Sequence, residues 1–229
     1  MSGGVYIYVG ITQSGKTTKA LSDLRQDIRE DGRPALIVDL GPAINFKGTY
    51  HEKDRQAVFR KLYGEQSHAV YTPHDMDDFD LLMNGVAKCG GIHVVLDEVR
   101  WVANYNRISV PLTTALRHWA HGDDGPVTYR CTSQRPGDLH RDFYACLTGD
   151  LYAFRIPPGL DQDRLVRECN FDQKALGTLP RGSFLTFSGK WEEKPGPVPE
   201  TPPEPVPAVN TPAPESITIP LASDPPASV

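Results

Sequence analysis

Cysteine pairs and long apolar runs are both missing from this 229-residue sequence. Its four cysteines are scattered, with no C-x-x-C pair, so we expect reduced, buried thiols rather than a zinc site or a disulfide framework. No stretch approaches 18 consecutive apolar residues, and the chain does not start with a basic segment followed by an apolar one. These absences argue against a transmembrane helix and a secretory signal, and we expect a soluble, intracellular protein.

Positive charge is scarce as well. The net charge is −5, which gives no overall indication of nucleic-acid or membrane affinity. Residues 195–229 hold 12 prolines, four acidic residues and no Lys or Arg, and such a segment buries too little apolar surface to fold. We expect a disordered, partly polyproline-II tail there, either a solvated appendage or a docking segment. Residues 1–194, with a net charge of −1, form the expected folded domain.

Within residues 1–194, apolar runs alternate with helical patterns, which favours an α/β fold with a mostly parallel sheet flanked by helices. Short continuous apolar runs are typical of strands that are covered on both faces. We expect strands at residues 5–9, 35–39, 68–72, 92–96, 127–132, 147–156 and 182–187. We expect helices at residues 16–30, around 58–62, at 75–88 and at 111–121.

Residues 10–17 read Gly-Ile-Thr-Gln-Ser-Gly-Lys-Thr, a complete G-x-x-x-x-G-K-[ST] phosphate-binding loop between an apolar strand and a helix. Its glycines let consecutive backbone N–H groups face the phosphates, and the helix adds its positive dipole end. Lys16 is expected to reach the β- and γ-phosphates, and Thr17 to hold Mg²⁺. The residues expected to bind ATP are Gly10, Ile11, Thr12, Gln13, Ser14, Gly15, Lys16, Thr17 and Thr18.

A second motif lies about 80 residues downstream, where an apolar strand ends in Asp97 and Glu98. The strand is expected to place Asp97 at the carboxyl edge of the sheet, beside the phosphate loop, where it can orient Mg²⁺. Glu98 can then polarise a water molecule for attack on the γ-phosphate. The pair favours hydrolysis of the nucleotide over signalling-type GTP binding, and no N-K-x-D stretch indicates guanine recognition.

A third motif, Thr132-Ser-Gln-Arg-Pro136, lies at the end of the fifth expected strand. Gln134 is expected to project between the first two motifs and to contact the attacking water or the γ-phosphate. Arg117, near the end of the preceding helix, and Arg135 are candidates for an arginine that reaches a neighbouring subunit's γ-phosphate. The alternative for each arginine is an ordinary surface position.

Together, the three motifs resemble the FtsK/HerA superfamily of P-loop ATPases in order and spacing over roughly residues 4–156. The compact size is similar to the genome-packaging ATPases of viruses with an internal membrane, such as the A32-like and tectivirus-type enzymes. The resemblance implies a RecA-like core, a ring that is usually hexameric, translocation of double-stranded DNA, and an arginine finger supplied in trans. It also implies a place in the host cytoplasm or at the packaging vertex of the virion, with capsid or viral membrane proteins as possible partners.

A DNA motor needs a basic ring lumen, although this domain is nearly neutral overall. Two stretches are candidates for lining it. The first directly follows the carboxylates and carries Arg100 and Arg107 among Trp101 and Tyr105; the second contains Lys47, Lys53 and Arg55. The alternative for both stretches is a solvated loop.

Four other functions share parts of this pattern. A thymidine-kinase-type nucleoside kinase also pairs such a loop with a strand ending in Asp-Glu, but it usually has a cysteine-rich zinc element. A Zot-like phage export ATPase usually has a transmembrane segment. A HerA-like ATPase of plasmid mobilisation or DNA repair has the same core. A scaffold that only binds nucleotide would not require Glu98 beside Asp97.

Overall fold

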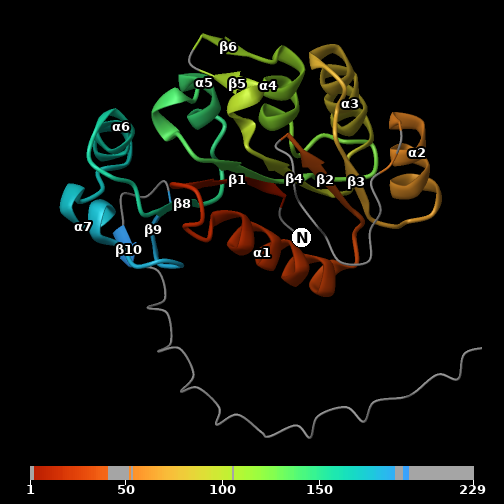
Figure 1. Cartoon of the computed structure of the whole chain (residues 1–229). Helices are drawn as coiled ribbons and strands as arrows, with labels where there is room; N and C mark the ends of the chain where they lie inside the picture. Colours follow the sequence, from red (N-terminus) through yellow and green to blue (C-terminus); the bar gives the residue numbers. More distant parts are fainter. Residues whose placement is uncertain (1–2, 41–51, 53, 105, 189–192, 196–229) are drawn as a thin grey trace, which may run out of the picture. The chain divides into compact units, whose positions relative to one another are not determined.

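The computed structural model describes residues 3–40, 52, 54–104, 106–188 and 193–195. The strands in this part are β1 (Gly4–Val9), β2 (Ala35–Asp39), β3 (Ala69–Tyr71), β4 (His93–Asp97), β5 (Ala103–Asn104), β6 (Arg107–Ile108), β7 (Thr128–Ser133), β8 (Leu151–Phe154), β9 (Phe184–Phe187) and β10 (Glu193–Pro195). Eight of them form one sheet in the order β10-β9-β8-β1-β7-β4-β2-β3, while β5 and β6 form a separate hairpin (Figure 1).

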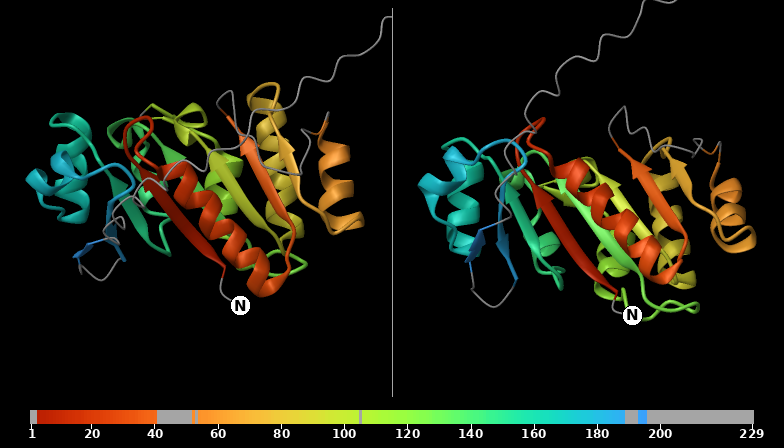
Figure 2. Two further views of the ribbon diagram at one scale, coloured as in Figure 1. Left: turned by 60° about the horizontal axis from the view of Figure 1, so that its bottom comes forward. Right: turned by 90° about the horizontal axis from the view of Figure 1, so that it is seen from below.

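Helices cover both faces of this sheet. They are α1 (Lys16–Asp31), α2 (Arg55–Phe59), α3 (Met76–Cys89), α4 (Val110–Arg117), α5 (Arg141–Tyr144), α6 (Leu160–Cys169) and α7 (Gln173–Thr178), with short helical turns η1 (Arg60–Gly64), η2 (Val99–Trp101) and η3 (Pro136–Asp138). Helix α1 lies across one face, and α3, α4 and α5 cover the other (Figures 1 and 2). The predicted α/β fold with a mostly parallel sheet is confirmed.

Strand β7 lies between β1 and β4, and all three strands run parallel. Val9, at the end of β1, is in register with Ser133, and Leu96, near the end of β4, is in register with Cys131. The chain segments that follow these strands therefore meet at one edge of the sheet. This edge is where an open parallel sheet binds its ligands.

Local sequence signals explain where most helices begin. Asp75 caps α3 by accepting a hydrogen bond from the backbone N–H of Asp78, and Ser109 caps α4 in the same way from Leu112. Helix α1 ends at Gly32, whose left-handed φ of 73° lets its N–H bond back to the carbonyl of Ile28. These caps fix the ends of the helices that pack on the sheet.

Most predicted elements lie within one or two residues of the observed ones, but two predicted elements are too long. The helix predicted to reach residue 121 ends at Arg117, because the chain turns at His118. The strand predicted from residue 147 begins at Leu151, because the N–H groups of Thr148 and Gly149 both bond to the carbonyl of Val5 and form no ladder. Neither difference moves a motif away from the carboxyl edge.

Helices α6 and α7 have no counterpart among the sequence predictions. Helix α6 has few apolar residues on its buried face, since Gln162 is buried there beside Leu165 and Cys169. Asp172 could have indicated the start of α7, because its carboxylate caps this helix by accepting a hydrogen bond from the N–H of Ala175. The proline-rich tail from residue 196 onward lies outside the described residues, as do Lys47, Lys53 and Tyr105.

All four cysteines are free, and Cys131, Cys146 and Cys169 are buried. Burial raises the pKa of the Cys131 and Cys169 thiols, the latter to about 12, so both stay protonated at neutral pH. No helix in the described part of the chain combines the length and the apolar character that crossing a membrane requires.

Candidate active site

The loop between β1 and α1 has the backbone conformation that a phosphate cradle needs. Gly10 and Gly15 have φ values of 155° and 108°. A Cβ atom on Gly10 would lie 2.7 Å from Cβ of Phe154 and 2.8 Å from Oγ of Ser14, so a side chain has no room there. The loop is fixed at both ends, because the N–H of Gly10 bonds to Ser133 and the carbonyl of Ser14 accepts from Gly182.

Two polar side chains of this loop lie where a phosphate would bind. Lys16 is only 6% exposed, and its ammonium interacts electrostatically with the carboxylates of Glu98 and Asp97. Burial lowers the pKa of Lys16, and these two carboxylates raise it in part. The Ser14 hydroxyl is buried with no hydrogen-bond partner among the described residues. A bound triphosphate would supply an acceptor for Ser14 and further negative charge beside Lys16, so the loop fits ATP.

Asp97 lies opposite the loop, and its carboxylate accepts hydrogen bonds from two hydroxyl groups. The Thr17 hydroxyl donates to Oδ1 of Asp97 at 3.0 Å, and the Thr132 hydroxyl donates to the same atom at 2.6 Å. A hydroxyl and a carboxylate oxygen this close are donor types that Mg²⁺ accepts. The donor set therefore fits the predicted metal-binding role of Thr17 and Asp97.

Glu98 is held in an unusual backbone conformation that turns it toward the loop. Its φ and ψ of 63° and 54° are left-handed, which is uncommon for a residue with a side chain and occurs often at functional sites. Burial raises the pKa of its carboxyl group, and the N–H of Gln134 and the charge of Lys16 oppose that rise. A buried carboxylate with raised proton affinity is suited to act as a general base.

Gln134 connects the loop to the carboxylates. Its backbone N–H donates to Oε1 of Glu98 at 3.1 Å, and its side-chain oxygen accepts from the Thr12 hydroxyl at 2.8 Å. A change at the loop can therefore reach Glu98 through one residue. The structure thus brings together Lys16, Thr17, Asp97, Glu98 and Gln134 at one edge of the sheet.

The sequence reasoning missed Thr132 as a functional residue. Its hydroxyl donates to the Asp97 carboxylate and accepts from the N–H of Glu98 at 3.0 Å, so it holds the Asp97 side chain and the Glu98 backbone. An available signal was its position: Thr132 lies near the end of β7, two residues before Gln134.

The two candidate arginines lie in different places. Arg117 is the last residue of α4. Two residues later, the carbonyl of Trp119 accepts a hydrogen bond from the N–H of Val127, which directly precedes β7. Arg117 therefore lies toward the amino edge of the sheet. Its nearest carboxylate is that of Asp142, at 4.0 Å. Arg135 follows β7 at the carboxyl edge and pairs with Asp161 at 3.6 Å. Both side chains are more than half exposed.

The candidate DNA-lining residues are also split. Arg100 and Trp101 belong to η2, directly after Glu98, and Arg107 begins β6 of the small hairpin. Arg55, in contrast, pairs with Asp78 of α3 at 3.0 Å and starts α2 at the far end of the sheet. The first stretch is therefore next to the candidate site, and the second is not.

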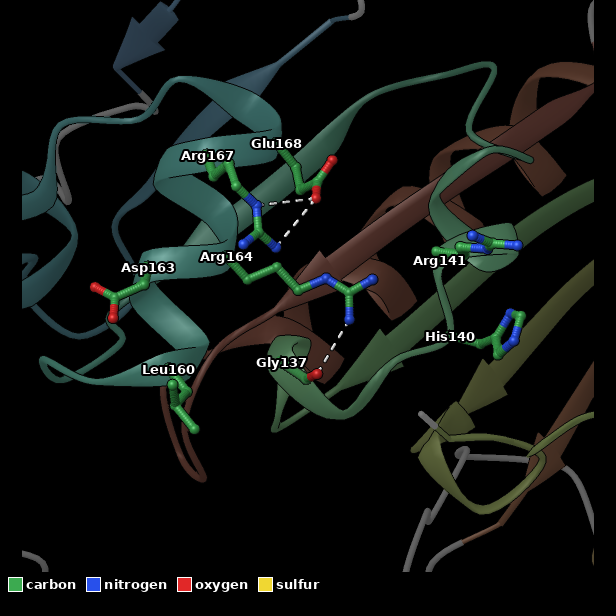
Figure 3. A pocket seen from close by; sticks show the side chains of 8 residues that line it. All are labelled: Gly137, His140, Arg141, Leu160, Asp163, Arg164, Arg167 and Glu168. Carbon is green, nitrogen blue, oxygen red and sulfur yellow. Dashed lines mark hydrogen bonds and ion pairs between the residues drawn. The ribbon is translucent and has the colours of Figure 1, made fainter. Parts of the chain in front are cut away.

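A cavity of about 930 Å³ lies between η3, α5 and α6 (Figure 3). Its arginines are already engaged: Arg164 points across the cavity to the carbonyl of Gly137, Arg167 pairs with Glu168, and Arg141 pairs with Asp142. None of the predicted site residues lines it, so we assign nucleotide binding to the loop and not to this cavity.

Several solved structures are similar to this chain in fold. The genome packaging NTPase B204 from Sulfolobus turreted icosahedral virus 2, in complex with AMP, matches with a TM-score of 0.68 at 17% identity, over 86% of this chain and 98% of that chain. This chain shares its fold with that viral NTPase. At 17% identity, this match shows the fold, which is the fold that the resemblance to FtsK/HerA-type ATPases implied.

Two other ATP-handling proteins match over a smaller share of their length. The pCW3 conjugation coupling protein TcpA, solved with ATPγS, has a TM-score of 0.59 at 15% identity, over 85% of this chain and 60% of that chain. The type VII secretion ATPase EccC of Thermomonospora curvata has a TM-score of 0.53 at 11% identity, over 85% and 23%. No protein-family profile matches the sequence, and no curated protein matches it.

Proposed function

We propose that this protein is an ATP-hydrolysing translocase of double-stranded DNA that packages a viral genome into a preformed capsid. The observation that carries the proposal is the position of Lys16, which lies at the end of a glycine loop beside Asp97 and Glu98, together with the Ser14 hydroxyl of the same loop, which is buried with no partner among the described residues. Phosphate oxygens of ATP would accept from the loop and its lysine, and Mg²⁺ would balance the carboxylates. The overlap with 98% of a genome packaging NTPase supports the DNA-packaging part of the proposal.

Each residue then has a defined task. Lys16 and the loop N–H groups bind the β- and γ-phosphates, and Thr17 and Asp97 hold Mg²⁺, which neutralises charge on the transferring oxygens. Glu98 accepts a proton from the attacking water. Gln134, bonded to both Thr12 and Glu98, responds to the γ-phosphate.

We further propose that the chain works as a ring, with six subunits as the expected number. Arg117 lies toward the edge of the sheet opposite its own phosphate loop, so it can contact a γ-phosphate only in another copy. Arg135 is the second candidate for this contact, since it lies exposed at the carboxyl edge. An arginine supplied in trans accelerates such hydrolysis by about 10³–10⁵-fold.

The direct test measures ATP turnover by the full chain with Mg²⁺, in the presence and absence of linear double-stranded DNA. We expect turnover that requires Mg²⁺ and rises with DNA. Phosphorylation of thymidine is measured in parallel, because a thymidine-kinase-type enzyme would transfer the phosphoryl group to it. Thymidine phosphorylation without DNA stimulation would contradict the proposal.

Mixed assembly tests the arginine in trans. Arg117→Ala and Lys16→Ala subunits are each expected to be inactive alone, and mixing them should restore part of the activity because intact sites form between the two. The same mixture with Arg135→Ala distinguishes the two candidates. Absence of restoration with both arginine variants, although they fold and assemble, would count against a finger at either position.

The fold match to a conjugation coupling protein favours one second candidate, a HerA-like ATPase of plasmid mobilisation. Both functions predict DNA-stimulated hydrolysis, so turnover does not separate them. Association of the purified protein with empty capsids would favour packaging, whereas association with a relaxase–DNA complex would favour mobilisation. A Zot-like export role would require association with a membrane protein.

A further inference from the structure

Helix α6 presents two charged side chains to the turn that follows the third motif. Asp161 and Arg164 lie three residues apart, so they share one face of the helix, and both form hydrogen bonds to the backbone of this turn. The helix itself is anchored in the fold by Gln162, Leu165 and Cys169, which are buried. Asp161 and Arg164 therefore extend from a fixed support.

Three hydrogen bonds join this face of α6 to the backbone of the turn. Oδ1 of Asp161 accepts from the N–H of Gly137 at 2.7 Å. Nη1 of Arg164 donates to the carbonyl of Gly137 at 3.0 Å (Figure 3) and also to the carbonyl of Leu139. The approach is close, because a Cβ atom on Gly137 would lie 2.6 Å from the same Asp161 oxygen. The two side chains thus hold both the N–H and the carbonyl of Gly137.

Side-chain contacts hold the beginning of the same turn. Oδ2 of Asp161 lies 3.6 Å from Nε of Arg135. The Arg164 guanidinium lies 4.8 Å from the centroid of the Tyr144 ring, and the Tyr144 hydroxyl donates to the carbonyl of Pro136 at 2.9 Å. Asp161 and Arg164 therefore act on the turn along its length, directly and through Tyr144.

Gln134 lies between this turn and β7, which ends at Ser133. Its side-chain oxygen accepts from the Thr12 hydroxyl of the phosphate loop at 2.8 Å. The strand holds the chain before Gln134, and α6 holds the chain after it, so the backbone that carries this side chain is fixed from both sides. Such fixing matters for catalysis, because a displacement of about 1 Å at a reacting group lowers the rate by up to about 10²-fold.

We propose that Asp161 and Arg164 are positioning residues for ATP hydrolysis, which hold the turn after β7 so that the Gln134 side chain stays in place beside the phosphate loop. The proposal rests on the ATPase function proposed above. In the part of the chain that the structure describes, none of the hydrogen bonds or ion pairs of Asp161 and Arg164 reaches residues 10–18. Their loss should therefore slow the chemical step and leave ATP binding unchanged.

The test measures kcat and KM for ATP on the full-length chain, with each rate expressed per molecule that binds a fluorescent ATP analogue, so that unfolded protein does not count. Arg164→Ala should lower kcat by about 10- to 100-fold and change KM by less than about twofold. Asp161→Ala should lower kcat by about tenfold and leave KM unchanged. Asp161→Asn can still accept from the N–H of Gly137, so its kcat should stay within about threefold of wild type.

Two matched controls lie on the same helix. Arg167 and Asp163 have contacts with Glu168 and Gln173 instead of with the turn. Arg167→Ala and Asp163→Ala should therefore keep the wild-type kcat and KM. Wild-type kcat in both Arg164→Ala and Asp161→Ala would overturn the proposal.

A double-mutant cycle separates positioning from a general structural role. In a Gln134→Ala background the side chain to be positioned is absent, so adding Arg164→Ala should lower kcat by less than about threefold. A further loss of tenfold or more in this background would overturn the proposal, because α6 would then act independently of Gln134. A wild-type chain that does not hydrolyse ATP would instead overturn the proposed function itself.

Discussion

Two clusters of buried charge lie on the α1 side of the sheet, and they differ in how their charges are balanced. One is the candidate active site at the carboxyl edge. The other, which we call the charged belt, lies between α1 and strands β4 and β7 and consists of Asp27, Asp31, Arg33, His93 and Arg130.

The charged belt balances its charges internally. Arg130 is buried, pairs with Asp27, and lies over the ring of Tyr6. The Asp31 carboxylate forms two hydrogen bonds: Oδ1 lies 3.0 Å from Nε2 of His93, and Oδ2 accepts from Nε of Arg33 at 2.7 Å. Each cation therefore has an anion of α1 beside it, and the belt fixes this helix on the sheet.

The candidate active site is arranged differently, because Lys16 forms no ion pair with a described residue and lies near two carboxylates, Asp97 and Glu98. Buried charges that pair with each other hold the fold, whereas one cation near two carboxylates leaves charge for a ligand to balance. Mutations in the two clusters should therefore change different quantities, namely catalysis in one and stability in the other.

The largest effect is expected from Lys16→Ala. Removal of the ammonium leaves the β- and γ-phosphates without their main charged contact, so ATP turnover should fall by at least about 10³-fold. The free energy of unfolding should change by less than about 1 kcal/mol, because the variant removes a desolvated charge together with its attraction to Glu98 and Asp97. ATPase assays and urea unfolding of the ligand-free protein measure the two quantities. A clear loss of stability would contradict the assignment of Lys16 to catalysis alone.

Glu98→Gln should separate binding from hydrolysis within the same cluster. Glutamine keeps the size of the side chain but cannot accept a proton, so turnover should fall by about 10²–10⁴-fold. Binding of a fluorescent ATP analogue should stay within about threefold of wild type, since Glu98 is assigned no phosphate contact. Wild-type turnover in this variant would remove Glu98 from its proposed role.

The sequence predicts that the residues of the candidate active site lie together, as the structure has them, and gives no indication of the charged belt, for a physical reason. Asp97 ends β4, Gln134 directly follows β7, and Lys16 lies after the glycine loop that follows β1; parallel strands bring such positions to one edge. His93 and Arg130 instead lie inside strands, and Asp31 and Asp27, their partners on α1, are 62 and 103 residues away. Strand periodicity gives no indication of which helical carboxylate will neutralise a buried base. Thr132 was missed for a related reason, since its two bonds depend on the register between β4 and β7.

Arg130→Ala should break the charged belt without touching the chemistry. It removes the partner of Asp27 and leaves a cavity beneath α1, so the free energy of unfolding should fall by about 3 kcal/mol. Turnover per folded molecule, measured well below the unfolding temperature, should stay within about twofold of wild type. Arg29→Ala on the exposed side of α1 is the control and should change neither value. Equal stability of Arg130→Ala and wild type would show that the belt does not hold the helix.

The smallest expected effect is the pH dependence of the charged belt. Burial lowers the pKa of His93, although its hydrogen bond to Asp31 opposes this. Burial alone would raise the pKa of Asp31, but the hydrogen bonds from His93 and Arg33 outweigh it and hold that pKa at about 2. Both groups bind a proton more readily in the unfolded chain, so stability should fall with decreasing pH, first below about 6.5 and then between about 4 and 2.

The Asp31 contribution amounts to about 2 kcal/mol at neutral pH. Urea unfolding between pH 8 and pH 3 measures both stages. His93→Gln should reduce the upper stage to the share of His68, whose pKa burial also lowers, because glutamine can still donate to Asp31 but does not titrate. Asp31→Asn should remove the lower stage. His121→Gln, at an exposed position, should leave both in place. If the upper stage kept its full size in His93→Gln, it would belong to another histidine. The charged belt would then stabilise the fold independently of pH in this range.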